Sequence, residues 1–263
     1  MWPIPEVAVK ELVVDTPRGP LRALLGVPSG AGPWPGVVVI HDAGGLTLDT
    51  GQQAKWLSGE GFLAIAPDLF RGRGPLRCML SMIQDIRARR GDSFEDIQAV
   101  RRTLLDREDC TGRVGIVGFC MGGGFALVMA LGRGFDAANV NYGTVSLDSV
   151  SEPEFASACP IVASYGRKDL ANRGSAARLS EILTRHQVPH DVKEYPTAGH
   201  GFMNDHEGAG DRIPLVFQVM GWATRTKYDP VATVDSRERI AVFFNQHLSR
   251  PSAPRAARAQ DER

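Results

Sequence analysis

Residues 113–124 read RVGIVGFCMGGG, an apolar run that ends in a cysteine enclosed by glycines. The run is typical of a strand buried on both faces, and the glycine cluster predicts the start of a helix. In a nucleophile elbow, the reactive side chain lies on a strained turn between a strand and a helix. This turn would place Cys120 at a helix N-terminus, where the helix dipole favours a thiolate. The stretch therefore predicts a nucleophilic cysteine, with the backbone N–H of Met121 directed at a developing oxyanion.

The same stretch is compatible with roles for Cys120 that involve no nucleophilic attack. A buried structural cysteine beside glycines fits these residues. A redox-sensing thiol also fits them, and it would require Cys120 but no other catalytic residue. A dinucleotide site is disfavoured, because the glycines do not have the G-x-G-x-x-G spacing.

The rest of the chain alternates predicted strands with predicted helices. An antiparallel hairpin, Val7–Val14 with Leu21–Val27, is followed by predicted strands at 36–41, 62–70, 113–119, 138–142, 160–166 and 191–195. Predicted helices cover 52–60, 76–90, 93–105, 125–131, 174–186 and 237–248. This alternation predicts an α/β fold with a mostly parallel central sheet and helices on both of its faces.

Length and composition fit one domain. The chain has 263 residues, and its 30 basic residues balance 30 acidic ones, so no net field draws it to nucleic acid or an anionic membrane. We expect a single domain over residues 1–248 and a disordered tail over 249–263. No signal-peptide pattern and no long apolar run is visible, and the four cysteines form no C-x-x-C pair, so we expect a cytoplasmic protein with reduced thiols.

A nucleophile elbow also predicts an acid and a histidine later in the sequence. In an α/β-hydrolase, the triad follows the order nucleophile, acid, histidine, and each residue comes after a strand. PIVASYGRKDL (160–170) is a predicted strand and a turn that carries Asp169, and DVKEYPTAGHGF (191–202) is a strand and a loop that carries His200. Asp169 alone could cap a helix, and His200 alone could be a core histidine. Together with Cys120, in this order, they predict a Cys–His–Asp triad.

These motifs resemble the dienelactone hydrolase family of α/β-hydrolases. The resemblance is carried by GFCMGG (118–123), YGRKD (165–169) and AGHGF (198–202), with support from VVVIHDAGG (37–45) and APDLF (66–70). It implies the α/β-hydrolase fold and a triad that opens a lactone or small ester through a thioester. The family's named activity is the hydrolysis of dienelactone to maleylacetate (carboxymethylenebutenolidase).

The resemblance also implies roles around the triad. Asp42 stands where the family has a glutamate that assists the thiol, and Ala43 stands where the family has the second oxyanion-binding N–H. Where the family has a serine and an arginine that bind the substrate carboxylate, this chain has Gly201 and Asn204. Further candidates for the substrate come from the arginine-rich segment after residue 70: Arg71, Arg73, Arg77 and Arg87. Most of these arginines could equally form a solvated helix face.

The predicted function is therefore hydrolysis of a small-molecule lactone or carboxylic ester through a cysteine thioester. We expect no cofactor and no metal, because the His and Asp residues near His206 have no metal-ligand spacing. We expect no nucleic-acid or membrane partner, and either a monomer or a homodimer. The alternative function is a member of the fold that binds a small ligand without turnover.

Overall fold

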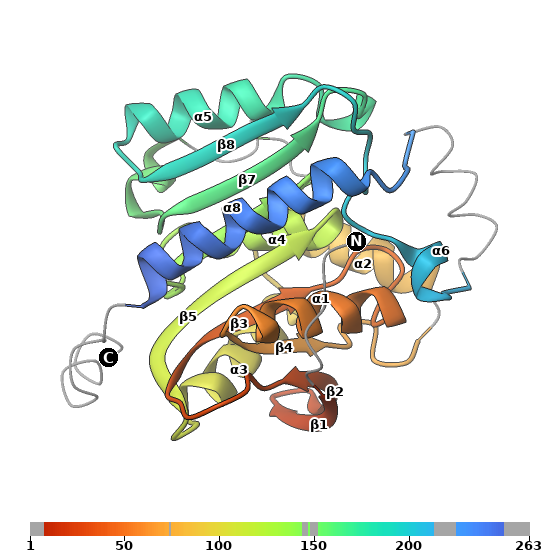
Figure 1. Cartoon of the computed structure of the whole chain (residues 1–263), viewed down its shortest axis with the longest axis vertical. Coiled ribbons are helices and arrows are strands. Elements are labelled where there is room, and N and C mark those ends of the chain that lie inside the picture. Colours follow the sequence, from red (N-terminus) through yellow and green to blue (C-terminus); the bar gives the residue numbers. More distant parts are fainter. Residues whose placement is uncertain (1–7, 74, 144–146, 148–151, 213–224, 250–263) are drawn as a thin grey trace.

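The central sheet decides where the site lies. The computed structural model describes residues 8–73, 75–143, 147, 152–212 and 225–249, without the side chains of residues 75–77. Its eight-stranded sheet has the order β1-β2-β4-β3-β5-β6-β7-β8 (Figure 1). The hairpin of β1 (Val9–Thr16) and β2 (Gly19–Gly26) is antiparallel and joins β4 (Leu63–Pro67) antiparallel, whereas the remaining neighbours pair parallel. The predicted mostly parallel sheet and N-terminal hairpin are confirmed.

The remaining elements follow the predicted alternation. The other strands are β3 (Trp34–Ile40), β5 (Cys110–Phe119), β6 (Ala137–Asn141), β7 (Ile161–Gly166) and β8 (His190–Tyr195). The helices are α1 (Leu48–Gly59), α2 (Pro75–Ala88), α3 (Asp92–Leu105), α4 (Met121–Ala130), α5 (Ser175–Arg185), α6 (His206–Ala209) and α8 (Pro230–Leu248), with short 3₁₀ turns η2 (Glu152–Ser157) and η3 (Leu170–Asn172).

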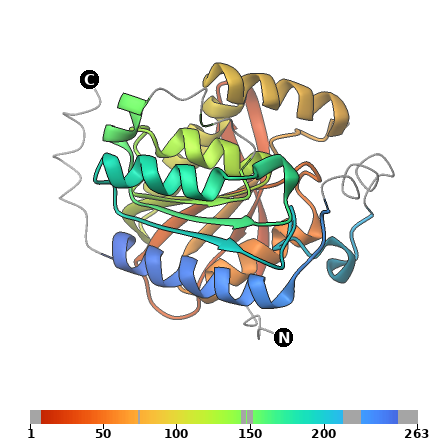
Figure 2. The same cartoon turned by 90° about the horizontal axis from the view of Figure 1, so that it is seen from above.

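Helices cover both faces of the sheet. On one face, Trp56 of α1 and Phe244 of α8 pack with Val117 of β5. On the other face, Phe94 of α3 and Phe125 of α4 pack with residues that include β5 Ile116. Figure 2 shows this separation, with α8 (blue) and α5 (green) on opposite sides of the strands. Because the central strands are covered on both faces, their sequences are continuous apolar runs rather than alternating ones.

Several boundaries differ from the sequence-based prediction, among them the following three. The strand predicted to reach residue 70 ends at Pro67, because the Asp68 carboxylate accepts hydrogen bonds from the N–H groups of Phe70 and Gly72 and starts a turn. Helix α1 begins at Leu48 rather than at residue 52. Helix α8 begins seven residues before the predicted 237, at Pro230.

The predicted tail, apart from Ser249, lies outside the described residues. Its disorder and the single-domain boundary at 248 therefore remain predictions. No helix in the described ranges has the length and apolar character needed to cross a bilayer.

The start of α8 provides a test of local stability. Asp229 caps this helix by accepting hydrogen bonds from the N–H groups of Val231 and Ala232, and Pro230 occupies the first turn, where its missing N–H costs nothing. We expect Asp229→Ala to lower the free energy of unfolding by about 1 kcal/mol, measured by chemical denaturation. Asp229→Asn retains a capping oxygen and serves as the control. An equal loss in both variants would contradict a capping role.

Candidate active site

Cys120 lies on a strained turn between β5 and α4. Its backbone has φ 55° and ψ −115°, an unfavourable conformation for a residue with a side chain. A Cβ atom at Gly118 would lie 2.0 Å from the carbonyl oxygen of Gly122, and one at Gly122 would lie 2.3 Å from that of Ile40. Glycine is therefore required at both positions, and the turn has the geometry predicted for a nucleophile elbow. The second contact also places the end of β3 directly against the elbow.

The predicted acid and histidine meet although 31 residues separate them. Asp169 follows β7, and its Oδ2 lies 2.7 Å from Nδ1 of His200, which follows β8. The same carboxylate accepts hydrogen bonds from the N–H of Ala171 and from the side chain of Asn172, so it also caps η3. Asp169 thus caps η3 and also bonds to His200, and its role as the triad acid stays a prediction. Since Nδ1 bonds to Asp169, Nε2 of His200 is left for Cys120.

The charges of this group stabilise one another. Burial favours neutral His200, but the side chains of Cys120 and Asp169 outweigh it and raise the pKa of His200 to about 10. Burial likewise opposes ionisation of Asp169, yet the hydrogen bonds from His200 and Asn172 lower the pKa of this carboxyl group. The arrangement therefore favours a protonated His200 imidazole beside the ionised carboxylate of Asp169.

A buried tyrosine lies behind the imidazole. The ring of Tyr142 meets that of His200 edge-on, with centroids 5.2 Å apart, and its hydroxyl donates to Oδ1 of Asn204 at 2.5 Å. Asn204 in turn donates to the carboxylate of Asp49 at 2.7 Å. Both ends of the Asn204 amide are thus bonded inside the protein. Tyr142 and Asp49 were not predicted from the sequence, because no motif marks them.

The proposed oxyanion donors lie on the two segments that meet at the elbow. Met121 is the first residue of α4, so its N–H has no acceptor within the helix. Ala43 follows β3, whose end packs against Gly122. The geometry thus brings the loop of Ala43 beside the start of α4. Both residues remain predicted as oxyanion donors.

Asp42 bonds to His206, a histidine for which the sequence predicts no catalytic role. Its Oδ2 lies 2.8 Å from Nε2 of His206, and its Oδ1 accepts the N–H of Gly44 at 2.8 Å. Burial opposes ionisation of Asp42, but His206 and Gly44 N–H lower the pKa of the carboxyl group. Both oxygens of Asp42 are thus bonded, one to His206 and one to the N–H of Gly44. Assistance to the Cys120 thiol by Asp42 stays a prediction.

Two of the arginine candidates, Arg71 and Arg73, line one cavity, and Arg87 is not among its lining residues. Arg71 donates two hydrogen bonds to the carboxylate of buried Asp96, at 2.7 and 3.1 Å. Arg71 and Arg73 line a cavity of about 520 Å³ together with Phe70 and Cys78. Arg87 is exposed in the last turn of α2, and the side chain of Arg77 lies outside the described residues. Among the described residues, no group of three or more His, Cys, Asp or Glu side chains is arranged to hold a metal ion.

Comparison with known proteins shows the family of the chain. The sequence model of the dienelactone hydrolase family matches residues 21–248. The chain belongs to the dienelactone hydrolase family. It is 24% identical to a carboxymethylenebutenolidase of Rhodococcus opacus over 225 residues, which cover 82% of this chain and 83% of that relative. It is 29% identical to a carboxymethylenebutenolidase of Pseudomonas putida over 137 residues, 48% of this chain and 56% of the relative.

Solved structures share the fold. A dienelactone hydrolase-like promiscuous phosphotriesterase from metagenomic libraries superposes with a TM-score of 0.75 at 20% identity, covering 92% of this chain and 98% of that one. A dienelactone hydrolase from Anabaena variabilis gives a TM-score of 0.66 at 18% identity, covering 92% and 99%. The predicted α/β-hydrolase fold is confirmed, and family membership makes the chain a hydrolase of the lactone and ester class.

The hydrogen bond between Asp169 and His200 can be tested by titration. Asp169→Asn removes a negative charge from the imidazolium, so we expect the pKa of His200 to fall below about 10, followed by NMR of its ring protons. Because the amide also favours the wrong tautomer, ester turnover should fall about ten-thousandfold. Glu181→Gln on the exposed face of α5 is the control. An unchanged pKa of His200 in Asp169→Asn would contradict the pairing.

Proposed function

We propose that this protein hydrolyses a lactone or small carboxylic ester through a thioester on Cys120, an activity of the carboxymethylenebutenolidase type. The observation that carries the proposal is the strained elbow at Cys120 combined with the 2.7 Å contact between Asp169 and His200. A structural cysteine would need neither the unfavourable backbone nor a buried ion pair whose histidine interacts with its sulfur.

The reaction has two halves. In the first, the Cys120 thiolate attacks the ester carbonyl carbon, and the carbonyl oxygen becomes an oxyanion that accepts hydrogen bonds from the N–H groups of Ala43 and Met121. As the intermediate collapses, the C–O bond breaks and His200 gives its proton to the leaving alkoxide. A lactone would open at this step without losing a fragment.

The second half releases the acid. Neutral His200 takes a proton from water, and the resulting hydroxide attacks the thioester carbonyl. The C–S bond then breaks, and Cys120 leaves as a thiolate paired with the imidazolium of His200. Asp169 keeps its charge throughout and holds the imidazole in the tautomer that both steps need. Each oxyanion donor is worth about 3–4 kcal/mol in the transition state.

The other cysteines are poor alternatives as nucleophiles. Burial raises the pKa of the Cys159 thiol to about 12, and burial also raises the pKa of Cys110. Cys78 is half-buried and donates weakly to the carbonyl of Phe70. All four cysteines are free thiols.

The nucleophile can be tested directly. Cys120→Ala should abolish turnover of activated esters and the covalent thioester seen by mass spectrometry, whereas Cys78→Ala should retain both. Cys120→Ser should fold but react slowly, because a hydroxyl has a much higher pKa than a thiol. Wild-type turnover in Cys120→Ala would exclude the thioester mechanism. A wild-type protein that binds but never turns over these esters would favour the ligand-binding alternative.

The substrate's charge can be tested with a matched pair of lactones. Asn204 is bonded internally and Arg71 is paired with Asp96, so neither provides a free partner for a carboxylate. The loss of one charge-assisted hydrogen bond costs about 1.5–3 kcal/mol, roughly tenfold to a hundredfold in affinity. We therefore expect kcat/KM for a lactone carboxylate to exceed that for its methyl ester by far less than a thousandfold. A preference of a thousandfold or more would contradict this expectation and direct alanine substitution to Arg73, Arg77 and Arg87.

A further inference from the structure

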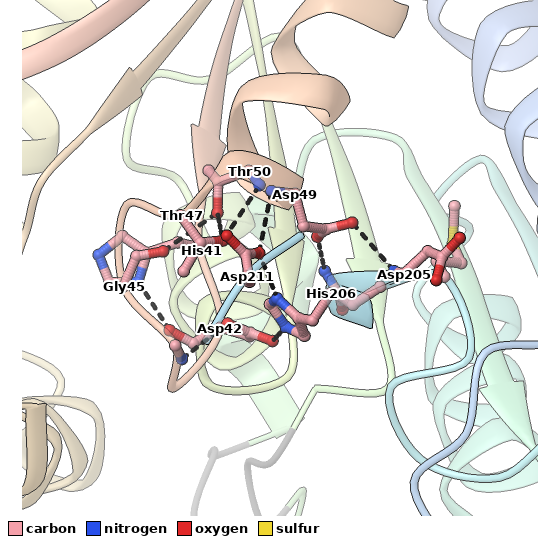
Figure 3. Close-up of polar contacts among 12 residues, drawn as sticks. His41, Asp42, Gly45, Thr47, Asp49, Thr50, Asp205, His206 and Asp211 are labelled. Atoms are coloured by element: carbon pink, nitrogen blue, oxygen red, sulfur yellow. Dashed lines mark hydrogen bonds and ion pairs between the residues drawn. The ribbon is translucent and has the colours of Figure 1, made fainter. Parts of the chain in front are cut away.

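His206 lies between two carboxylates. Its Nε2 is 2.8 Å from Oδ2 of Asp42, and its Nδ1 is 2.9 Å from Oδ2 of Asp211 (Figure 3). A carboxylate accepts hydrogen bonds and cannot donate them, so both ring nitrogens must carry a proton. The contacts therefore describe an imidazolium shared by two aspartates, and only 17% of its side chain is exposed.

The two aspartates hold opposite ends of one loop. Asp42 begins the loop that follows β3, and its second oxygen accepts the N–H of Gly44, so the residues on both sides of Ala43 are tied together. Asp211 accepts the N–H groups of Leu48 and Asp49 at 2.8 and 3.1 Å, at the start of α1. The loop of residues 42–48 is thereby fixed at both ends to one imidazole ring.

That ring belongs to the segment that carries the triad histidine. His206 begins α6, six residues after His200. The charged groups that face it are Asp42, Asp211 and Asp49, and a Cβ atom at Gly44 would lie 3.3 Å from Cε1 of the ring. Burial disfavours the charged ring, but these aspartates raise the pKa of His206 to about 10.

We propose that His206 is a positioning residue, which holds the 42–48 loop so that the N–H of Ala43 stays directed at the oxyanion. The proposal rests on the thioester mechanism above, because that mechanism forms the oxyanion to which the N–H of Ala43 would donate. His206 touches no reacting atom and acts through Asp42 and Gly44. A donor that is displaced by about 1 Å loses much of its effect on the transition state.

The central experiment compares two reactions of Cys120. Ester hydrolysis needs the oxyanion donors, whereas alkylation by iodoacetamide displaces iodide and forms no oxyanion. We expect His206→Gln to lower kcat tenfold to a hundredfold, with KM and the alkylation rate within about threefold of wild type. His190→Gln, in which the replaced histidine lies at the start of β8, is the matched control and should change neither.

A pH series separates positioning from general stability. The pKa of folded His206 is raised from 6.5 to about 10, so the imidazolium that fixes the loop is present at neutral pH and is lost as the pH rises through about 10. The ratio of wild-type to His206→Gln kcat should therefore be constant at low pH and shrink toward one near pH 10. His200 titrates in both proteins, so its effect cancels in the ratio.

Two outcomes would overturn the proposal. One is unchanged kcat in His206→Gln, and the other is a parallel loss of alkylation and hydrolysis in a folded variant. If His206→Gln does not fold, Asp211→Asn can replace it, because the amide oxygen can still accept one N–H at the start of α1 but the side chain loses the charge that pairs with His206. We expect the same selective loss of kcat there, and unchanged kcat in Asp211→Asn would equally overturn the proposal.

Failure of the proposed function can be recognised separately. If the wild-type protein hydrolyses no ester, the thioester mechanism fails, but the loop can still be examined by amide hydrogen exchange. His206→Gln should then speed exchange at Gly44 and Leu48 about tenfold, since their acceptors lose the imidazolium that fixes them. Unchanged exchange at both amides would overturn the positioning role.

Discussion

The close approach of three backbone segments at Gly118 and Gly122 is the constraint on which the site depends. Any Cβ at Gly122 would collide with the carbonyl of Ile40, so β3, β5 and α4 can meet only if this residue is glycine. Their meeting forces Cys120 into a positive-φ conformation that costs on the order of 1–3 kcal/mol. The surrounding core must supply that energy, and all ten residues of α4 are buried in it. The same approach brings the loop after β3 beside the N-terminus of α4.

The pKa values of the buried carboxyl groups around the site shift in different directions, depending on which groups donate hydrogen bonds to them. Asp42, Asp169 and Asp211 each accept from a histidine, and in each the hydrogen bonds outweigh burial and lower the pKa. Asp49 is equally enclosed but accepts from neutral groups, the amide of Asn204 and the N–H of Asp205, and burial raises its pKa. The charge of the donors rather than the number of hydrogen bonds therefore decides the direction of each pKa shift. The two imidazolium rings, of His200 and His206, are the charges that decide it.

The departure from the family's substrate-binding residues has a structural explanation at Asn204. The position does not face an open site, because its amide links Tyr142 to Asp49 in the interior. Tyr142 then packs against the ring of His200. In this chain Asn204 thus links Asp49 to the tyrosine that packs against His200, and a role in binding substrate stays a prediction.

The sequence by itself determined much of the fold and singled out the three residues proposed as the triad. Apolar runs mark the buried strands, glycines mark the elbow, and Asp169 and His200 each follow a strand in the order that the fold demands. These signals are local, because they depend on the conformation of a few adjacent residues. The signal for the start of α8 is also local, because it consists of Asp229 followed by Pro230. The apolar pattern alone did not identify it.

The tertiary structure alone decided the partners of the polar side chains. His206 meets Asp42 across 164 residues, and Asn204 meets Asp49 across 155. No periodicity or spacing records such a pairing, because it depends on how loops from different strands converge at one edge of the sheet. For that reason the sequence suggested Asp42 as a partner of the thiol and gave His206 no role as a metal ligand. Only the folded chain shows that the two bind each other.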